Sequence, residues 1–225
     1  MLEEIKREII RTGIKLDRYG LIALSGGNVS VRAPGGEILV TPSGMEYGEI
    51  EEQDIVVLNP EGEKIEGSRK PSSDTEAIIY IFRHRPDVGA VIHTHQPYAT
   101  AIGLVEDRFR VNLSTLANSA AGDVNVSPYS SPGSLQMGID VVKHIGSSLA
   151  IILANHGVVT IGSDLKQALY AAVYMEEAAK TWLAARCTGL PMREMSPAQI
   201  RQAIDIFKFY GQGKPSIPDE LLKKV

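Results

Sequence analysis

Residues 91–97 read VIHTHQP and residues 152–159 read ILANHGVV, and these two stretches hold three of the five histidines of the chain. The first stretch completes a short, apolar and β-branched run, which predicts a buried strand. His93 and His95 lie at the end of that strand, and side chains two residues apart on an extended segment project to the same side. The second stretch is another apolar run and leads to His156. Two buried strands therefore each end in candidate functional groups.

The three histidines together suggest a metal site. Three imidazoles suit Zn²⁺ and leave one coordination position open for a substrate, which is typical of a catalytic rather than a structural zinc site. A lone histidine beside an apolar strand is more often a core or surface residue, so neither the HxH pair nor His156 alone would indicate a metal. Their joint occurrence, beside the loops described below, favours metal binding.

The composition is that of an ordinary soluble protein. The chain has 225 residues, of which 44% are hydrophobic and 22% charged, and its net charge is −4. The lack of a basic tract argues against a nucleic-acid partner, and no apolar run approaches membrane-spanning length. The single cysteine, Cys187, cannot form an internal disulfide, and the charged N-terminus lacks the pattern of a signal peptide. We therefore expect a cytoplasmic protein that does not associate with membranes.

Hydrophobic periodicity predicts the surrounding elements. Helices are expected over residues 2–19, 72–81, 133–145, 165–186 and 197–210, and further strands over 28–33, 37–41, 55–58, 64–66 and 158–161. Residues 106–132 are polar and rich in turn signals, and they are harder to assign. Strands mixed with helices without a regular βα alternation favour an α/β fold with a central, mostly antiparallel sheet. We expect a single domain over 1–225, in which about 212–225 form a flexible C-terminal tail or a flap over a neighbouring site.

Three segments are rich in glycine and hydroxyl residues: Gly26-Gly27-Asn28, Thr41-Pro42-Ser43-Gly44 and Pro71-Ser72-Ser73. Glycine lets the backbone approach a ligand, and N–H and hydroxyl groups are the donors that a phosphate dianion needs. The serine pair is the sharpest candidate, because it precedes an expected helix N-terminus. Each segment also has a structural explanation, since Ser73 and Glu76 have capping-box spacing and the other two segments are ordinary turn sequences. Their occurrence beside the histidines favours phosphate binding.

Asp74 follows the two serines, in the first turn of the expected helix. A carboxylate there interacts favourably with the helix dipole, which is worth about 0.3–1 kcal/mol. Beside a metal it would instead be a ligand, or the group that exchanges a proton with a metal-bound substrate hydroxyl. The sequence leaves both roles open.

These motifs, in this order, resemble the class II aldolase/adducin superfamily, and most closely its L-fuculose-1-phosphate aldolase branch. The resemblance runs from near residue 2 to about 211. The matching stretches are SGGNVSVR, LVTPSGMEY, KPSSDTEAIIYIFRHRPDVGAVIHTHQPYATAI, SPYSSPGS and ILANHGVVTIG, followed by a helical tail that ends in IFKFYGQ.

The resemblance implies a three-layer α/β/α domain that assembles as a homotetramer, with active sites near the subunit interfaces. It implies that one zinc ion per subunit binds to His93, His95 and His156. Asp74 matches the position of the acid/base. The positions that hold the substrate phosphate match Gly27, Asn28, Ser43, Gly44, Ser72 and Ser73.

The chain departs from the aldolase pattern at two places. The aldolases usually carry Glu at the position of Asp74, whereas Asp is typical of the L-ribulose-5-phosphate 4-epimerase branch, and its shorter side chain has a different reach. The aldolases also present a tyrosine from a neighbouring subunit as a proton donor, but residues 112–122 contain no tyrosine. Tyr129 is the nearest one in sequence and matches a different family position. The aspartate-tyrosine stretch of the epimerases is missing there too.

The resemblance favours a zinc-dependent class II aldolase that reversibly cleaves a ketose 1-phosphate, such as L-fuculose 1-phosphate, to dihydroxyacetone phosphate and a small aldehyde. Asp74 would move the proton between substrate oxygen and carbon. One alternative is epimerisation of a pentulose 5-phosphate, which Asp74 supports; dehydration or decarboxylation of a related sugar phosphate is another. A non-catalytic binding protein, as in the adducin head domains, is disfavoured because those domains lack the histidines.

Overall fold

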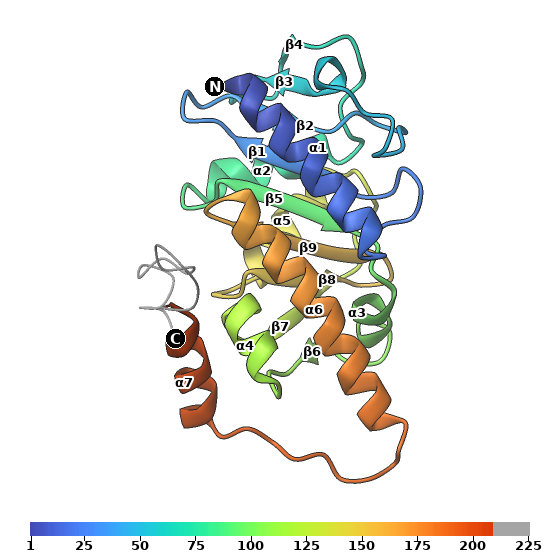
Figure 1. Cartoon of the computed structure of the whole chain (residues 1–225), viewed down its shortest axis with the longest axis vertical. Coiled ribbons are helices and arrows are strands. Elements are labelled where there is room, and N and C mark those ends of the chain that lie inside the picture. The colour runs from blue at the N-terminus through green and yellow to red at the C-terminus, as the bar shows by residue number, and fades with distance from the viewer. Residues whose placement is uncertain (209–225) are drawn as a thin grey trace.

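A single sheet forms the centre of the computed structural model, which describes residues 1–208 (Figure 1). Its nine strands are β1 (Asn28–Arg32), β2 (Ile38–Val40), β3 (Val56–Leu58), β4 (Lys64–Glu66), β5 (Ala90–Thr94), β6 (Arg108–Phe109), β7 (Val124–Ser127), β8 (Ala150–Leu153) and β9 (Gly157–Gly162). Their order across the sheet is β4-β3-β2-β1-β5-β9-β8-β7-β6. Neighbours are antiparallel except β7 and β8, which run parallel. The expected mostly antiparallel central sheet is confirmed.

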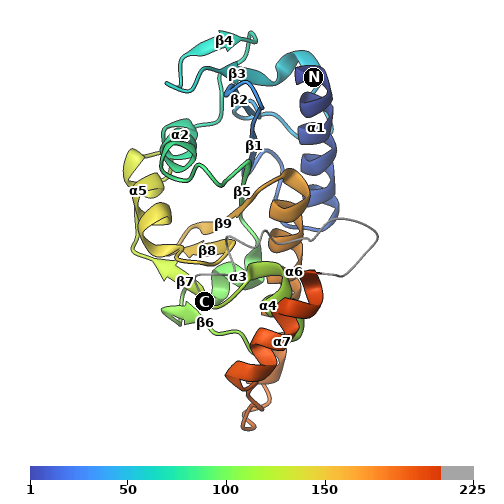
Figure 2. The same ribbon diagram turned by 90° about the vertical axis from the view of Figure 1, so that its left-hand side faces the viewer.

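Helices cover both faces of this sheet. The seven α-helices of the described residues are α1 (Leu2–Arg18), α2 (Thr75–His84), α3 (Pro97–Ile102), α4 (Ser114–Ala120), α5 (Leu135–His144), α6 (Leu165–Arg186) and α7 (Pro197–Lys208), and a 3₁₀ turn spans Glu52–Asp54. In Figure 2, α1 and α6 lie on one side of the strands and α2 and α5 on the other. Helices α3 and α4 pack against α6, and α7 packs against α4. The arrangement is a three-layer α/β/α fold.

Strand β5 lies near the middle of the sheet and is buried on both faces. Val91 packs into the core beneath α2 and α5, whereas its neighbour Ile92 packs into the core beneath α1 and α6. Both are at most 1% exposed, and burying an aliphatic side chain of this size contributes about 1.5–3 kcal/mol. Because successive side chains alternate between faces, a strand covered by helices on both sides reads as the continuous apolar run seen in the sequence.

Most of the expected elements form close to their predicted bounds, but the start of α2 differs. The helix begins at Thr75 rather than at the serines, and Asp74 is its N-cap residue without a side-chain cap. The capping box that offered a structural explanation for Ser73 and Glu76 is therefore not formed. The serine segment instead forms a turn of its own, in which the Thr75 hydroxyl donates to the carbonyl of Ser72 at 2.6 Å. This frees the side chain of Asp74 from the helix backbone.

The segment that resisted assignment, residues 106–132, contains β6, α4 and β7. The last helix expected from the sequence, residues 197–210, is described as far as Lys208. Its final two residues and the predicted tail, 212–225, lie outside the described residues. None of the helices within residues 1–208 combines the length and the apolar character that crossing a membrane requires.

Candidate active site

The sheet brings the three histidines together. His93 belongs to β5, which pairs with β1 on one side and with β9 on the other. In the pairing with β1, Asn28 lies opposite His93. His95 follows the end of β5, and His156 lies in the short turn between β8 and β9. The ring centroids are 4.7 Å (His93–His156), 4.8 Å (His93–His95) and 5.2 Å (His95–His156) apart. One ligand nitrogen from each ring lies within 4.8 Å of the others.

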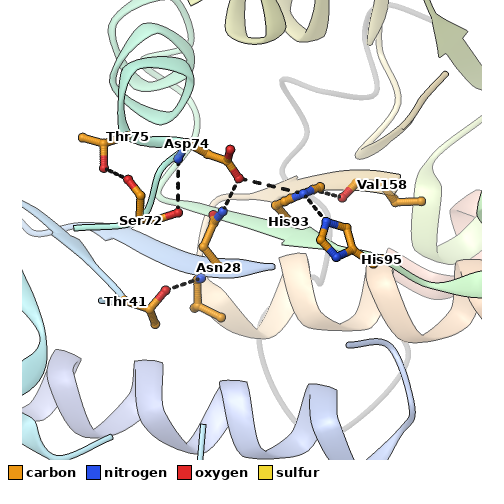
Figure 3. Close-up of polar contacts among 9 residues, drawn as sticks. Asn28, Thr41, Ser72, Asp74, Thr75, His93, His95 and Val158 are labelled. Carbon is orange, nitrogen blue, oxygen red and sulfur yellow. Dashed lines mark hydrogen bonds and ion pairs between the residues drawn. The ribbon is translucent and has the colours of Figure 1, made fainter. Parts of the chain in front are cut away.

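The hydrogen bonds of these rings fit a bound metal ion. The Nδ1 of His93 lies 2.9 Å from the carbonyl of Val158, which can only accept, so Nδ1 carries the proton and Nε2 is free to be a ligand (Figure 3). That Nε2 lies 3.1 Å from the Nε2 of His95. The Nδ1 of His156 is buried without a hydrogen-bond partner. Converging lone pairs and an orphaned buried nitrogen are what a metal ion would satisfy.

Burial keeps these imidazoles neutral. It lowers the pKa of His93 to about 3, with further contributions from the neighbouring His156 and His95. Burial also lowers the pKa of His95 and of His156, although Asp74 opposes it at both rings. Neutral imidazole is the form that binds metals, so near neutral pH the three rings do not need to lose a proton before they coordinate an ion.

Three glycines allow the loops to close around the histidines. A Cβ atom at Gly157 would lie 3.1 Å from the ring of His95 and would collide with the carbonyl of Thr94. At Gly26 it would lie 2.9 Å from the Nδ1 of His95. Gly27 has a φ of +74° and passes directly over the His93 carbonyl. Sequence reasoning did not single out Gly157, although its position directly after His156 is a usable signal.

Asp74 lies beside the histidines and is 6% exposed. Its Oδ2 accepts a hydrogen bond from the Nδ2 of Asn28 at 2.7 Å and lies 3.8 Å from the Nε2 of His93 (Figure 3). Burial raises the pKa of Asp74, while His156, Asn28, the backbone N–H of Gly133 and His95 oppose that rise. The carboxylate is thus a fourth potential metal donor, or a base adjacent to the metal.

The glycine and serine loops meet the histidines in one cavity of about 180 Å³. The loops are tied together because the N–H of Ser43 donates to the carbonyl of Lys70 and the N–H of Ser72 donates to that of Thr41. The cavity brings together five of the six predicted phosphate-binding residues with Asp74 and the three histidines; those five are Gly27, Ser43, Gly44, Ser72 and Ser73.

The sixth predicted residue, Asn28, does not line this cavity, but it contacts Asp74, which does. It is 1% exposed, and its amide nitrogen is already engaged by Asp74. A second difference is that Pro132 lines the cavity, and that Gly133, which was expected to begin a helix, belongs to the turn before α5. Gly133 has a φ of +75°, and a Cβ there would lie 3.0 Å from the carbonyl of Ser73. The glycine lets this turn rest directly on the serine loop.

Comparison with known proteins agrees with this geometry. Residues 7–183 match the model of the family described as "Class II Aldolase and Adducin N-terminal domain". The chain is 32% identical to the 5-deoxy-D-ribulose 1-phosphate aldolase of Bacillus thuringiensis, over 94% of this chain and 99% of that protein. It is also 32% identical to the L-fuculose phosphate aldolase of Haemophilus influenzae, over 92% and 95% respectively. A solved structure of an L-fuculose 1-phosphate aldolase superposes with a TM-score of 0.86 at 31% identity, over 92% of this chain and 97% of that one.

Proposed function

Because the chain belongs to the class II aldolase and adducin family, we propose that it is a zinc-dependent aldolase that reversibly cleaves a ketose 1-phosphate to dihydroxyacetone phosphate and a small aldehyde. One observation carries the proposal. Three neutral imidazoles, a buried carboxylate and two serine loops share a single cavity. This set offers ligands for a metal, a group for proton transfer and donors for an anion next to one another.

In this proposal His93, His95 and His156 hold one Zn²⁺ per subunit, because an all-imidazole set suits zinc and leaves a position for substrate. A Zn²⁺ ion at this position would act as a Lewis acid, which stabilises the negative charge that develops on substrate oxygens when a carbon–carbon bond breaks. The hydrogen bond from His93 Nδ1 to the Val158 carbonyl fixes the tautomer that such binding requires.

Asp74 is the proposed acid/base. Its carboxylate is buried beside the histidines, 3.8 Å from the Nε2 of His93, where it can exchange protons with a substrate held at the same centre. Asn28 donates to one carboxylate oxygen, Oδ2, and so orients the group. Asp74 would take the proton from the substrate hydroxyl during cleavage and return a proton to the new carbon terminus.

The substrate phosphate is proposed to bind in the loops that contain Gly27, Ser43, Gly44, Ser72 and Ser73. Asn28, which follows Gly27 in the same loop, is the sixth proposed phosphate-binding residue, and its Nδ2 also donates to Asp74. Small residues and hydroxyl donors at the wall of one cavity support this assignment.

The names of the relatives suggest two candidate substrates for this chain. L-fuculose 1-phosphate would release lactaldehyde, and 5-deoxy-D-ribulose 1-phosphate would release acetaldehyde, since cleavage between the third and fourth carbons leaves dihydroxyacetone phosphate in both cases. The two reactions share the phosphate, the metal and Asp74, and they differ only in the aldehyde. A coupled assay for dihydroxyacetone phosphate therefore tests both.

The assay uses zinc-loaded wild type together with Asp74→Asn and His95→Ala, because His95 lines the cavity beyond the end of β5 and belongs to neither hydrophobic core. His84→Ala, at an exposed histidine outside the site, is the matched control. We expect release by the wild type and the control and a loss of at least ~100-fold in both site variants. No release from either sugar by protein that binds zinc stoichiometrically would overturn the aldolase assignment.

Epimerisation of a pentulose 5-phosphate is the second candidate, and the presence of Asp rather than Glu at position 74 favours it. The same preparation, incubated with L-ribulose 5-phosphate and analysed by NMR for the C4 epimer, separates the two activities. Conversion without accumulation of free aldehyde would support the epimerase.

We also propose that the protein is a cytoplasmic homotetramer with active sites near its subunit interfaces. Its cysteine, Cys187, is free and exposed, which suits a reducing compartment. Light scattering on the purified protein measures the assembly directly, and a monomeric mass would contradict it.

A further inference from the structure

A buried carboxylate lies outside the proposed reaction. Glu176 is on α6 and is 1% exposed. Its Oε1 accepts the backbone N–H of Tyr98 at 3.1 Å, and its Oε2 accepts that of Ala99 at 2.9 Å. These are the first N–H groups of α3, because the helix begins with Pro97, which has none. A residue from another helix thus takes the place of a local cap.

The residue before α3 does not cap it either. Gln96 makes no side-chain cap bond. Its Oε1 accepts the hydroxyl of Thr94 at 3.2 Å, and its Nε2 donates to the carbonyl of Ala172 at 3.4 Å. Ala172 lies one turn before Glu176 on α6, which runs alongside α3 (Figure 1). Helix α6 therefore holds the segment that follows β5 at two points.

His95 lies within this held segment, between Thr94 and Gln96. The ladder of β5 with β9 ends at Thr94, so the sheet fixes His93 but no longer fixes His95. The position of His95 depends on what anchors the chain after it. Hydrogen bonds to a carboxylate are roughly twice as strong as those between neutral groups, and a negative charge is favoured at a helix N-terminus.

We propose that Glu176 is a positioning residue for the metal centre: its carboxylate fixes the start of α3 and thereby the place of His95 relative to His93 and His156. The inference rests on the proposed metal site but on no particular substrate. According to this proposal, helix α6 contributes to metal affinity as well as packing against the sheet.

The test compares wild type with Glu176→Gln, which keeps the shape but sets an amide NH₂ against one of the two N–H donors. Glu176→Asp, which keeps the charge but reaches less far, is the second variant. Glu177→Gln is the matched control, because Glu177 is the next residue on α6, is exposed and pairs only with Lys180 among the contacts of the described residues. Zinc affinity is measured by calorimetry on metal-free protein, and urea unfolding of the same samples gives their stability.

We expect Glu176→Gln to weaken zinc binding by about tenfold or more, in the range seen for residues that orient metal ligands indirectly, and Glu177→Gln to leave it unchanged. The visible spectrum of the Co²⁺-loaded variant should also change, because the spectrum reports ligand geometry. Unchanged zinc affinity and an unchanged Co²⁺ spectrum, with only the unfolding midpoint lowered, would overturn the proposal and leave Glu176 a stabilising residue. A wild type that binds no metal would instead overturn the proposed metal site.

A measurement on the wild type alone decides the matter if the variants do not fold. Coupling between sites is reciprocal, so zinc should slow amide hydrogen exchange at Tyr98 and Ala99 if their contact with Glu176 supports the metal site. The amide of Gln167, which the carboxylate of Asp164 caps at the start of α6, is the internal control. Equal exchange at Tyr98 and Ala99 with and without zinc would contradict the inference.

Discussion

The neutrality of buried His93 makes the stability of the metal-free protein depend on pH in a calculable way. In the unfolded chain a histidine takes up a proton below about pH 6.5, whereas in the folded protein His93 does so only near pH 3. Between those values the unfolded state binds one more proton, so stability falls as the pH falls, by about 1.4 kcal/mol per pH unit. From pH 6.5 to 5 the loss attributable to His93 is about 2 kcal/mol.

Urea unfolding in the presence of a chelator, at about pH 7, 6 and 5, measures this slope. His93→Gln removes the titrating ring, so its loss of stability should be smaller than that of wild type by about 0.7 kcal/mol between pH 7 and 6 and by about 1.2 kcal/mol between pH 6 and 5. The lowered pKa values of His95 and His156 act in the same direction, and the raised pKa of Asp74 acts in the opposite one. Because His93 is coupled to His156 and His95, the difference between the two proteins reports the loss of the His93 ring together with its effect on these neighbours.

The reasoning would be refuted if the free energy of unfolding of wild type and of His93→Gln changed in parallel with pH. It would mean that His93 takes up its proton in the folded protein as readily as in the unfolded chain, and that burial does not hold the ring neutral. His84→Gln, at an exposed histidine, controls for any general effect of losing an imidazole. Adding zinc should steepen the wild-type profile, because protons then compete with the metal for the same nitrogens.

Three further perturbations have definite outcomes. Asn28→Ala removes a hydrogen bond that lowers the pKa of Asp74, so the acid limb of the pH–rate profile should move to higher pH. Because the lost bond is to a charged group, the free energy of unfolding in urea should also fall by about 1.5–3 kcal/mol. An unmoved acid limb would contradict the role given to Asn28. Gly157→Ala inserts a methyl group between the histidine rings, so zinc stoichiometry by metal analysis should drop well below that of Gly48→Ala, whose added methyl meets open space. Phe82→Ala empties a fully buried position and should lower the free energy of unfolding by about 3–5 kcal/mol while zinc stoichiometry is retained; a loss of zinc binding would show that the core and the site are not separable.

The sequence predicted the elements that local patterns determine. Strands β5 and β8 were predicted because a strand buried on both faces must be apolar throughout, and helix α1 because its apolar residues recur at helical spacing. The convergence of His93, His95 and His156 could be anticipated because each follows or ends such a strand. The metal-ligand hypothesis therefore needed little beyond strand geometry.

The remaining features depend on contacts between distant residues. The sequence placed Asn28 among the proposed phosphate-binding residues, but it did not indicate the register of Asn28 opposite His93 or its hydrogen bond to Asp74. The spacing of Ser73 and Glu76 satisfied a capping box, yet the loops around the cavity hold the serines in a separate turn. Residues 106–132 are organised by the parallel pairing of β7 with β8 and by packing of α4 on α6 and α7, which no local signal encodes.

The position of β5 between β1 and β9 has a consequence for biosynthesis. The bond that sets the tautomer of His93 comes from Val158, 65 positions later in the chain. A nascent chain that has emerged only as far as β5 already exposes the HxH pair, yet it lacks both His156 and the carbonyl that orients His93. We therefore expect tight metal uptake only after β9 has paired with β5, so ribosome-bound chains halted before and after β9 should differ in zinc retention. Metal loading would then report that the strands from β1 to β9 have paired, while α6 and α7 are still to be synthesised.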